Sequence, residues 1–292
     1  MEPAFSFPNF RQMYPHEKRK LKRFREYLRY QYAYRLHYKQ CKRFDAFLNQ
    51  YPLWIWIPLF QQQPYRVNSL LSTYCNRRWG GTQRLQAIIT NLTVAANKFG
   101  VESCQRLLAE GAIRLATLTE SLSLNLNINM IDPFEGFFSL NIQNTETQQS
   151  VYDASFTFLS ENELLIASIQ GPKGEQAQDV VRAVTKQLHG VRPMFMLVNG
   201  FCFLAQKLNC QLLGIPHRQQ AKYRWNDSAR LLFNYDEFWQ ENEAVKQGEY
   251  WCLPTEVERK PLEDIQSKKR SMYRKRYDMF DSVLEQCSAQ LS

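Results

Sequence analysis

Two of the chain's four histidines, His189 and His217, lie in one stretch of this 292-residue sequence. His189 stands near Arg192 at a break between two helix-like segments, and His217 follows the last apolar run of the stretch. Histidine exchanges a proton near neutral pH, and functional side chains of α/β proteins often emerge where strands end. One histidine could therefore act as a general base, with Arg192 binding an anionic group. The open alternative is that both histidines only hydrogen-bond to the backbone where elements end.

A glycine pair, Gly171 and Gly174, opens the connection inside the same stretch. It follows Leu164–Gln170, which is apolar on both faces, as expected for a strand buried inside a sheet. A helix-like segment, Glu175–Leu188, comes next. Backbone amides in such a strand-to-helix loop can bind a phosphate group. The pair lacks the Lys-Ser/Thr of a P-loop, so an ordinary loop stays an alternative.

A basic run near the end of the chain could bind an anion. Residues Lys268 to Arg276 carry six positive charges, and Lys268, Arg270, Arg274 and Arg276 are the candidate ligands. The run could bind phosphate, a lipid headgroup or RNA, or it could be a solvated face near a helix C-terminus.

A second basic segment accounts for the net charge of +9. Between Lys18 and Arg43 there are eleven Lys or Arg and one acidic residue, Glu26, so the rest of the chain carries −1. Leu21, Phe24 and Leu28 are spaced as on one face of a helix, and several tyrosines add an aromatic surface. This pattern is typical of a basic amphipathic helix that contacts anionic lipid or nucleic acid. A solvated helix that packs its Tyr/Leu face on the domain is the alternative.

The elements that must position these residues predict an α+β fold. We expect a basic helical extension over residues 1–65 and an α+β domain over residues 66–292. Helices are predicted at Thr82–Phe99 and Val101–Thr119. About five strands should form a mostly antiparallel sheet with crossover helices. They are Leu122–Met130, Phe137–Gln143, Ser150–Leu159, Leu164–Gln170 and Cys210–Ile215, the third and fourth forming a hairpin.

Membrane-spanning segments and metal sites are not predicted. The longest apolar runs, Tyr51–Phe60 and Met194–Ala205, are well short of the ~20 residues that cross a bilayer. Seven scattered cysteines, none two residues from another, argue against a zinc site or a disulfide framework. We therefore expect a cytoplasmic protein that is at most peripheral to the inner membrane.

Several motifs between about residue 65 and residue 285 are similar to those of one known family. They are Ile169–Gly171, Thr185–Pro193, Leu204–Ala205, Tyr235–Trp239, Gly248–Pro254, Lys260–Ile265 and Ser267–Tyr277. On these residues the chain resembles the VirK/YbjX family of Gram-negative bacteria. Where the family pattern would place a His-Tyr pair, this chain has Ile88–Leu92.

The resemblance implies a role in envelope maintenance, virulence and tolerance of antimicrobial peptides and stress, without an assigned reaction. It directs attention to Asp236 and Trp239, which lie inside matching motifs. On this basis we expect a peripheral factor whose basic surfaces bind anionic lipid or an envelope protein. Nucleic acid ranks behind these partners, because no recognised nucleic-acid-binding module is present.

A transferase is the alternative function. The strand–loop–helix–strand order looks like the acyl-CoA-binding core of GNAT acyltransferases, although fold alone does not fix function. The cofactor would then be an acyl-CoA whose pyrophosphate faces the amides between Gly171 and Gly174. His189, His217 and Asp236 would be the catalytic candidates of an acyl- or aminoacyl-transferase that modifies an envelope lipid or a surface protein.

Overall fold

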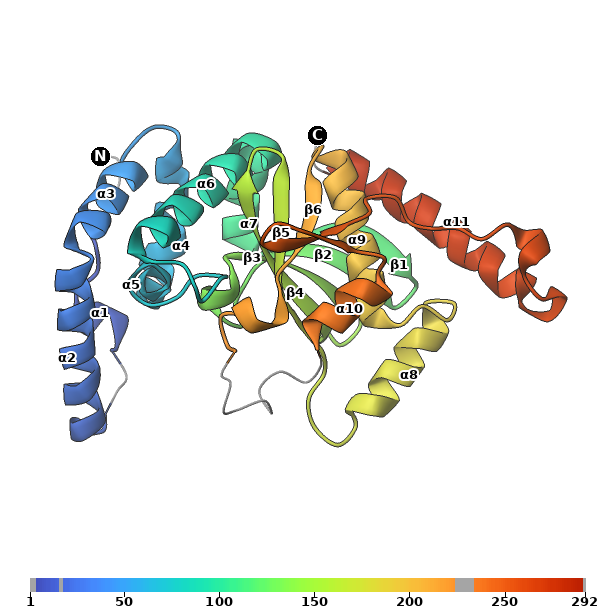
Figure 1. Cartoon of the computed structure of the whole chain (residues 1–292), viewed down its shortest axis with the longest axis horizontal. Coiled ribbons are helices and arrows are strands. Elements are labelled where there is room, and N and C mark those ends of the chain that lie inside the picture. Colours follow the sequence, from blue (N-terminus) through green and yellow to red (C-terminus); the bar gives the residue numbers. More distant parts are fainter. Residues whose placement is uncertain (1–3, 16–17, 224–233, 291–292) are drawn as a thin grey trace.

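One eight-stranded sheet organises the chain (Figure 1). The computed structural model describes residues 4–15, 18–223 and 234–290. The strand order is β1-β2-β3-β4-β5-β6-β8-β7, and among the described strands only the β5–β6 pair is parallel. The strands are β1 (Ala112–Thr119), β2 (Leu122–Ile128), β3 (Phe138–Asn144), β4 (Ser150–Ser160), β5 (Glu163–Gln170), β6 (Gln211–Gly214), β7 (Val245–Gln247) and β8 (Tyr250–Leu253).

The α+β class, the mostly antiparallel sheet and the β4–β5 hairpin are confirmed. Eight strands replace the five expected, because β1, β7 and β8 were not predicted. The prediction of one helix over Val101–Thr119 was wrong in its second half. Helix α7 (Val101–Glu110) ends at Gly111, whose φ of +79° lies in the left-handed region that terminates helices. The chain then continues as β1 and pairs with β2.

Helices cover the apolar face of the sheet. Phe99 of α6 (Gly81–Phe99) contacts Phe138 of β3 and Phe158 of β4. Phe201 of α9 (Pro193–Lys207) contacts Phe156 of β4. Helix α11 (Ser267–Gln290) packs against β1 and α9, and α8 (Ala177–Gln187) projects from the body in Figure 1. This layer of aromatic contacts makes the main hydrophobic core.

The opposite face carries a polar row across four strands. Asn125, Asn141, Asp153 and Gln170 are cross-strand neighbours on β2, β3, β4 and β5. Apolar and polar residues alternate along β2, a pattern typical of a strand with one face toward water, yet Asn125 and the nearby Ser123 are buried. Asn125 Nδ2 donates to Asn141 Oδ1 at 3.0 Å, so burial of its amide is offset by a hydrogen bond.

The N-terminal part consists of short helices that share the main core. They are α1 (Phe10–Met13), α2 (Lys20–Leu36), α3 (Tyr38–Leu48), α4 (Ile57–Gln62) and α5 (Asn68–Leu71), with 3-10 turns at Leu53–Trp56 and Pro64–Val67. Trp56 is fully buried and its indole donates to the Leu92 carbonyl at 2.9 Å, so the second half of the apolar run, from Ile55 to Phe60, lies in the core, whereas Tyr51 is exposed. Phe5, Phe10 and Met13 are also buried, so the segment from Phe5 to Met13 forms part of the fold. A domain boundary at residue 65 stays a prediction.

The connection from β5 to β6 passes through α8 and α9, and α10 (Tyr235–Glu241) follows β6. Further 3-10 turns of the described residues lie at Pro133–Glu135, His217–Gln219 and Leu262–Asp264. Within the described ranges, no helix is both long enough and apolar enough to cross a bilayer.

Candidate functional site: a basic helix and the predicted anion ligands

Helix α2 leaves a continuous apolar stripe uncovered. Its members recur every three or four residues, as neighbours on one helix face do. Their exposed fractions are 87% for Leu21, 61% for Phe24, 51% for Leu28, 71% for Tyr32 and 60% for Leu36. Apolar side chains of this size are rarely exposed together on a monomer unless the surface binds something. We call these five residues the outer stripe.

The other side of α2 is docked on the chain that precedes it. Tyr30 is buried, and its phenol donates to the Pro8 carbonyl at 2.9 Å. Phe10 packs edge-on against Tyr27 with ring centroids 5.3 Å apart. Burial raises the pKa of Tyr30 to about 12, so the phenol keeps the proton that it donates. The face that carries Tyr27 and Tyr30 therefore holds the helix in place, and the outer stripe lies on the side that stays exposed.

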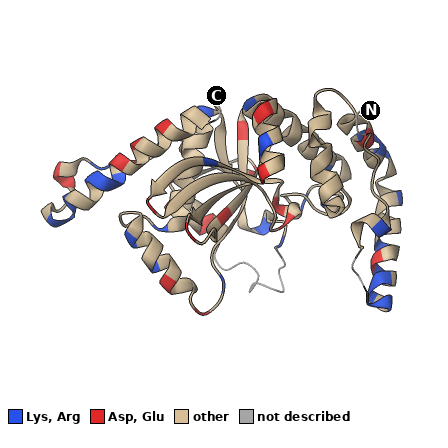
Figure 2. Cartoon of the chain, turned by 180° about the vertical axis from the view of Figure 1, so that it is seen from behind, with Lys and Arg blue, Asp and Glu red and all other residues tan. Residues whose placement is uncertain are grey.

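Positive charge follows the same helix. Figure 2 shows Lys and Arg gathered along α2. Its segment contains six Lys or Arg and one acidic residue, Glu26, which pairs with Arg29 at 2.9 Å. Arg25 and Arg29 side chains are each 63% exposed. A helix with an exposed apolar stripe and excess cations has the two properties that adsorption to an anionic membrane requires.

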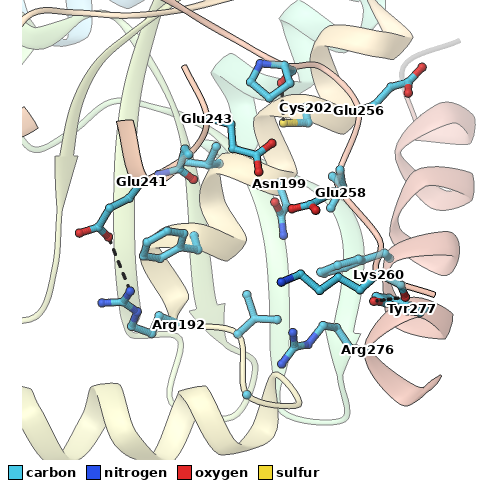
Figure 3. A pocket seen from close by; sticks show the side chains of 18 of the residues that line it. Arg192, Asn199, Cys202, Glu241, Glu243, Glu256, Glu258, Lys260, Arg276 and Tyr277 are labelled. Atoms are coloured by element: carbon cyan, nitrogen blue, oxygen red, sulfur yellow. Dashed lines mark hydrogen bonds and ion pairs between the residues drawn. The ribbon is translucent and has the colours of Figure 1, made fainter. Parts of the chain in front are cut away.

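A pocket of about 340 Å³ gathers two predicted anion ligands, Arg192 and Arg276 (Figure 3). Arg192 pairs with Glu241 at 3.6 Å and lies over the Phe195 ring at 4.4 Å. Four glutamates line this pocket beside its cations, namely Glu241, Glu243, Glu256 and Glu258. The pocket is therefore mixed in charge rather than a simple anion site.

Arg276 makes a structural contact there. Its guanidinium donates from Nε at 3.2 Å and Nη2 at 2.9 Å to the His189 carbonyl, and it lies 4.1 Å from the Tyr273 ring centroid. His189 has φ +51°, and burial, with Lys275 and Arg276 nearby, lowers the pKa of its imidazole. The structure thus joins His189 to α11 through its backbone.

The other cations of α11 lie in its first turns. Helix α11 begins at Ser267, so the suggestion that this run lies near a helix C-terminus was wrong. Arg270 donates to the carbonyls of Ile265 at 2.9 Å and Glu263 at 3.1 Å, whereas Lys268 and Arg274 are exposed. Their role as anion ligands stays a prediction.

His217 and Asp236 meet at the end of β6. Asp236 Oδ1 accepts from the His217 amide at 3.0 Å and from the Trp251 indole at 2.8 Å. His217 Nδ1 accepts from the Tyr235 amide at 3.3 Å, which places the imidazole proton on Nε2. Asp236 thereby organises the turn, while His217 and His189 contact different elements.

The glycine pair opens a loop with restricted space. A Cβ at Gly171 would come 2.6 Å from the Tyr152 ring, and Gly174 has φ +95°. The first turn of α8 follows at Ala177, whose amide donates to the Gly174 carbonyl at 3.2 Å. Gly174 therefore favours glycine for its backbone conformation and Gly171 for the space that the Tyr152 ring occupies, whether or not a phosphate binds there.

Sequence inspection missed a buried carboxylate, Glu135. Its side chain accepts from Gln170 Nε2 and lies 3.7 Å from Lys222, which also pairs with Asp132 at 3.0 Å. Burial raises the pKa of the Glu135 carboxyl, opposed by Lys222. No local pattern marks this residue, because its partners come from distant parts of the sequence.

Comparison with known sequences extends the family match beyond the motifs, toward the start of the chain. The profile of a family described as "Protein of unknown function (DUF535)" matches residues 19–289. The match includes the basic segment, which the motifs had left outside. No solved structure matches the chain.

Three relatives show the range of similarity. An uncharacterized protein of Haemophilus influenzae is 55% identical over 96% of this chain and 96% of its own length. Membrane protein LapB of Mannheimia haemolytica is 34% identical over 76% of this chain and 96% of its own length. The uncharacterized protein YbjX of Escherichia coli is 25% identical over 78% of this chain and 72% of its own length. These similarities confirm the resemblance predicted from the motifs.

Proposed function

This chain belongs to the DUF535 family, the proteins of VirK/YbjX type, and we propose that it works at an anionic membrane surface as a peripheral envelope factor. The observation that carries the proposal is the outer stripe of α2, exposed beside the helix's cations. A relative that is named as a membrane protein supports it.

The physical argument joins two contributions. Each Lys or Arg close to an anionic leaflet contributes about 1 kcal/mol, and burial of apolar side chains at the boundary of headgroups and acyl chains adds to this. On α2 both contributions come from one rigid element, because Tyr30 and Tyr27 hold it against Pro8 and Phe10 of the preceding segment. The bilayer would bind the outer stripe without unfolding the rest of the chain. Such a position suits a factor of envelope maintenance, virulence and stress tolerance, because it brings the protein to the inner membrane from the cytoplasmic side.

The test is binding of the full chain to lipid vesicles in a flotation assay. Vesicles that contain phosphatidylglycerol should carry the protein upward, and vesicles of phosphatidylcholine alone should not. Replacing Arg25, Arg29 and Arg35 by Gln removes three cations beside the outer stripe and should reduce flotation at least about tenfold, since three lost contacts correspond to ~3 kcal/mol.

A matched control removes the same charge elsewhere. Arg114 on β1 and Arg182 and Lys186 on α8 are exposed, and their replacement by Gln lowers the net charge equally. The proposal requires this control to float nearly like the parent chain. Equal loss in both variants would mean that only net charge matters, and would exclude α2 as the membrane-binding element.

Acyl transfer is a second candidate function that one observation favours. The parallel pair of the described strands, β5 and β6, stops pairing after Ile166 and Gly214, while β5 continues to Gln170 and the glycine loop. A ligand could follow the backbone of β5 there and reach His217. One contact opposes this: the amide and carbonyl of Ile169 are already bonded to the Tyr235 phenol.

A thermal-shift assay with acyl-CoA tests this candidate. A donor at 100 times its Kd stabilises the fold by about 2.7 kcal/mol, a shift that Gly174→Asp should abolish. Gly248→Asp is the control, since Gly248 also has positive φ and open space around its Cα. Absence of a shift for the parent chain would exclude an acyl-CoA transferase.

A further inference from the structure

Three arginines from two distant segments line one pocket of about 360 Å³. Arg77 and Arg78 follow α5, and Arg218 lies in the turn after β6. Tyr223 completes the lining, and the Arg77 guanidinium lies 5.4 Å from its ring centroid. The pocket shares no lining residue with the pocket of Arg192 and none with α2, so the proposed membrane surface does not use it.

Buried Asn76 fixes the two segments against each other. Its Nδ2 donates to Gln219 Oε1 at 2.8 Å, and its Oδ1 accepts from the Arg78 amide at 2.9 Å. The Arg77 amide donates to the Gln219 carbonyl at 3.0 Å. The arginines thus extend from backbone whose position is set by hydrogen bonds, and they are not on flexible ends.

The segment also carries features that packing alone does not require. Cys75 has φ +49°, a left-handed conformation that costs a non-glycine residue energy and that is often found at functional sites. Gln220, two residues after Arg218, is fully buried. In the part of the chain that the structure describes, neither Nε2 nor Oε1 of its side-chain amide has a hydrogen-bond partner. Such unsatisfied groups call for an explanation, and a bound ligand or water is one.

Charge is uncompensated around the pocket. In the described ranges, no acidic side chain pairs with Arg77, Arg78 or Arg218, and all three are exposed. Arg192 and Arg259, by contrast, each pair with a carboxylate. Three guanidiniums at one pocket repel one another, and an anion with more than one negative charge would relieve the repulsion.

We propose that Arg77, Arg78 and Arg218 bind a phosphate monoester. Guanidinium forks match phosphate oxygens in pairs, and a monoester carries up to two negative charges, whereas a diester carries one. The same chemistry is offered by a membrane lipid with a terminal phosphate and by a small phosphorylated compound in solution. His217 packs edge-on against Tyr223 with ring centroids 5.4 Å apart, so the pocket borders the turn that Asp236 organises.

Calorimetric titration of the full chain with inorganic phosphate at pH about 7.5, where the dianion dominates, tests the site itself. The parent chain should bind, and the triple variant R77Q/R78Q/R218Q should bind at least about tenfold more weakly. The R77K/R78K/R218K variant keeps the charges without the fork and should bind with an affinity between those two. Arg114→Gln, at an exposed arginine of β1, should bind like the parent chain.

Vesicle flotation distinguishes the two sources of phosphate. At equal total negative charge, vesicles with phosphatidic acid present a monoester and vesicles with phosphatidylglycerol present a diester. A preference for phosphatidic acid that the triple variant loses identifies a lipid ligand. No such preference, together with phosphate binding in solution, identifies a small soluble ligand.

The membrane proposal for α2 and the phosphate-site proposal can be refuted independently of each other. An α2 variant that stops floating but still binds phosphate leaves this site intact, and a triple variant that floats normally on phosphatidylglycerol leaves α2 intact. The site is overturned if the triple variant, with an unchanged thermal melt, binds phosphate like the parent chain. It is equally overturned if the parent chain binds no phosphate and does not prefer phosphatidic acid.

Discussion

The Tyr235 phenol holds both backbone groups of Ile169: it accepts from the Ile169 amide at 2.9 Å and donates to the Ile169 carbonyl at 3.0 Å. Strand β5 loses β6 as a partner just before this point. A side chain of α10 therefore replaces a strand at the edge where the parallel pair ends. Burial keeps the phenol protonated by raising the pKa of Tyr235.

Removing that hydroxyl should destabilise the fold strongly. Tyr235→Phe leaves a buried amide and a buried carbonyl without partners, at a cost of about 1–3 kcal/mol each. We expect a loss of ~2–5 kcal/mol in the free energy of unfolding in urea. Tyr32→Phe, on a residue that is 71% exposed, should change it by less than about 0.5 kcal/mol. Equal effects in both variants would show that the Tyr235 contact contributes no stability.

Arg276 should matter for stability more than its neighbour Lys275. Arg276→Ala removes two hydrogen bonds to the His189 carbonyl and the stacking on Tyr273, with an expected loss of about 1–3 kcal/mol. Lys275→Ala removes an equal charge from an exposed position and should be close to neutral. Urea unfolding of both variants at one salt concentration makes the comparison. A neutral Arg276→Ala would instead favour a ligand-binding role for this residue.

Mild acidification should lower the free energy of unfolding because it protonates His37, which lies between α2 and α3. Its Nε2 accepts from Arg84 Nη2 at 2.9 Å, and burial together with the Arg84 charge lowers the pKa of His37 below its usual 6.5. The folded state favours the neutral His37 imidazole, so the contribution of this residue to the free energy of unfolding is complete above pH 6.5. It is lost as the pH falls from 6.5 through the lower folded pKa, because the unfolded chain binds the proton more readily.

Urea unfolding of the parent chain and of His37→Gln across this pH range isolates the effect. His189 also has a lowered pKa and contributes with the same sign, but it does so in both proteins. The stability difference between parent and variant should therefore shrink as the pH falls below 6.5. A difference that is constant with pH would contradict the Arg84–His37 assignment.

Local periodicity predicted the parts of the fold that depend on local pattern. Strands β2 to β5 and helix α6 lie close to where alternation and helical spacing placed them. Strand β1 was missed because its residues directly follow the pattern of α7 and only Gly111 separates them. Strands β7 and β8 have three and four residues, which is too short for a periodic signal.

The candidate sites were harder to predict because their members are distant in sequence. Leu21, Phe24 and Leu28 were recognised as one helix face. Only the structure shows that the face with Tyr30 docks on the preceding segment and that the outer stripe stays exposed. The hydrogen bond between Asn76 and Gln219 brings Arg218 and Arg77 to one pocket. Nothing in the spacing of these residues along the sequence predicts that they lie together.

Hydrogen exchange of the full chain, with and without phosphatidylglycerol vesicles, tests the membrane proposal most directly. Adsorption through the outer stripe should slow amide exchange within Lys20–Leu36 and leave the sheet strands β2 to β5 unchanged. Addition of salt to ~1 M shortens the Debye length to about 3 Å and should reverse the protection. Protection confined to α11 or to the sheet, or binding without protection of α2, would contradict the account.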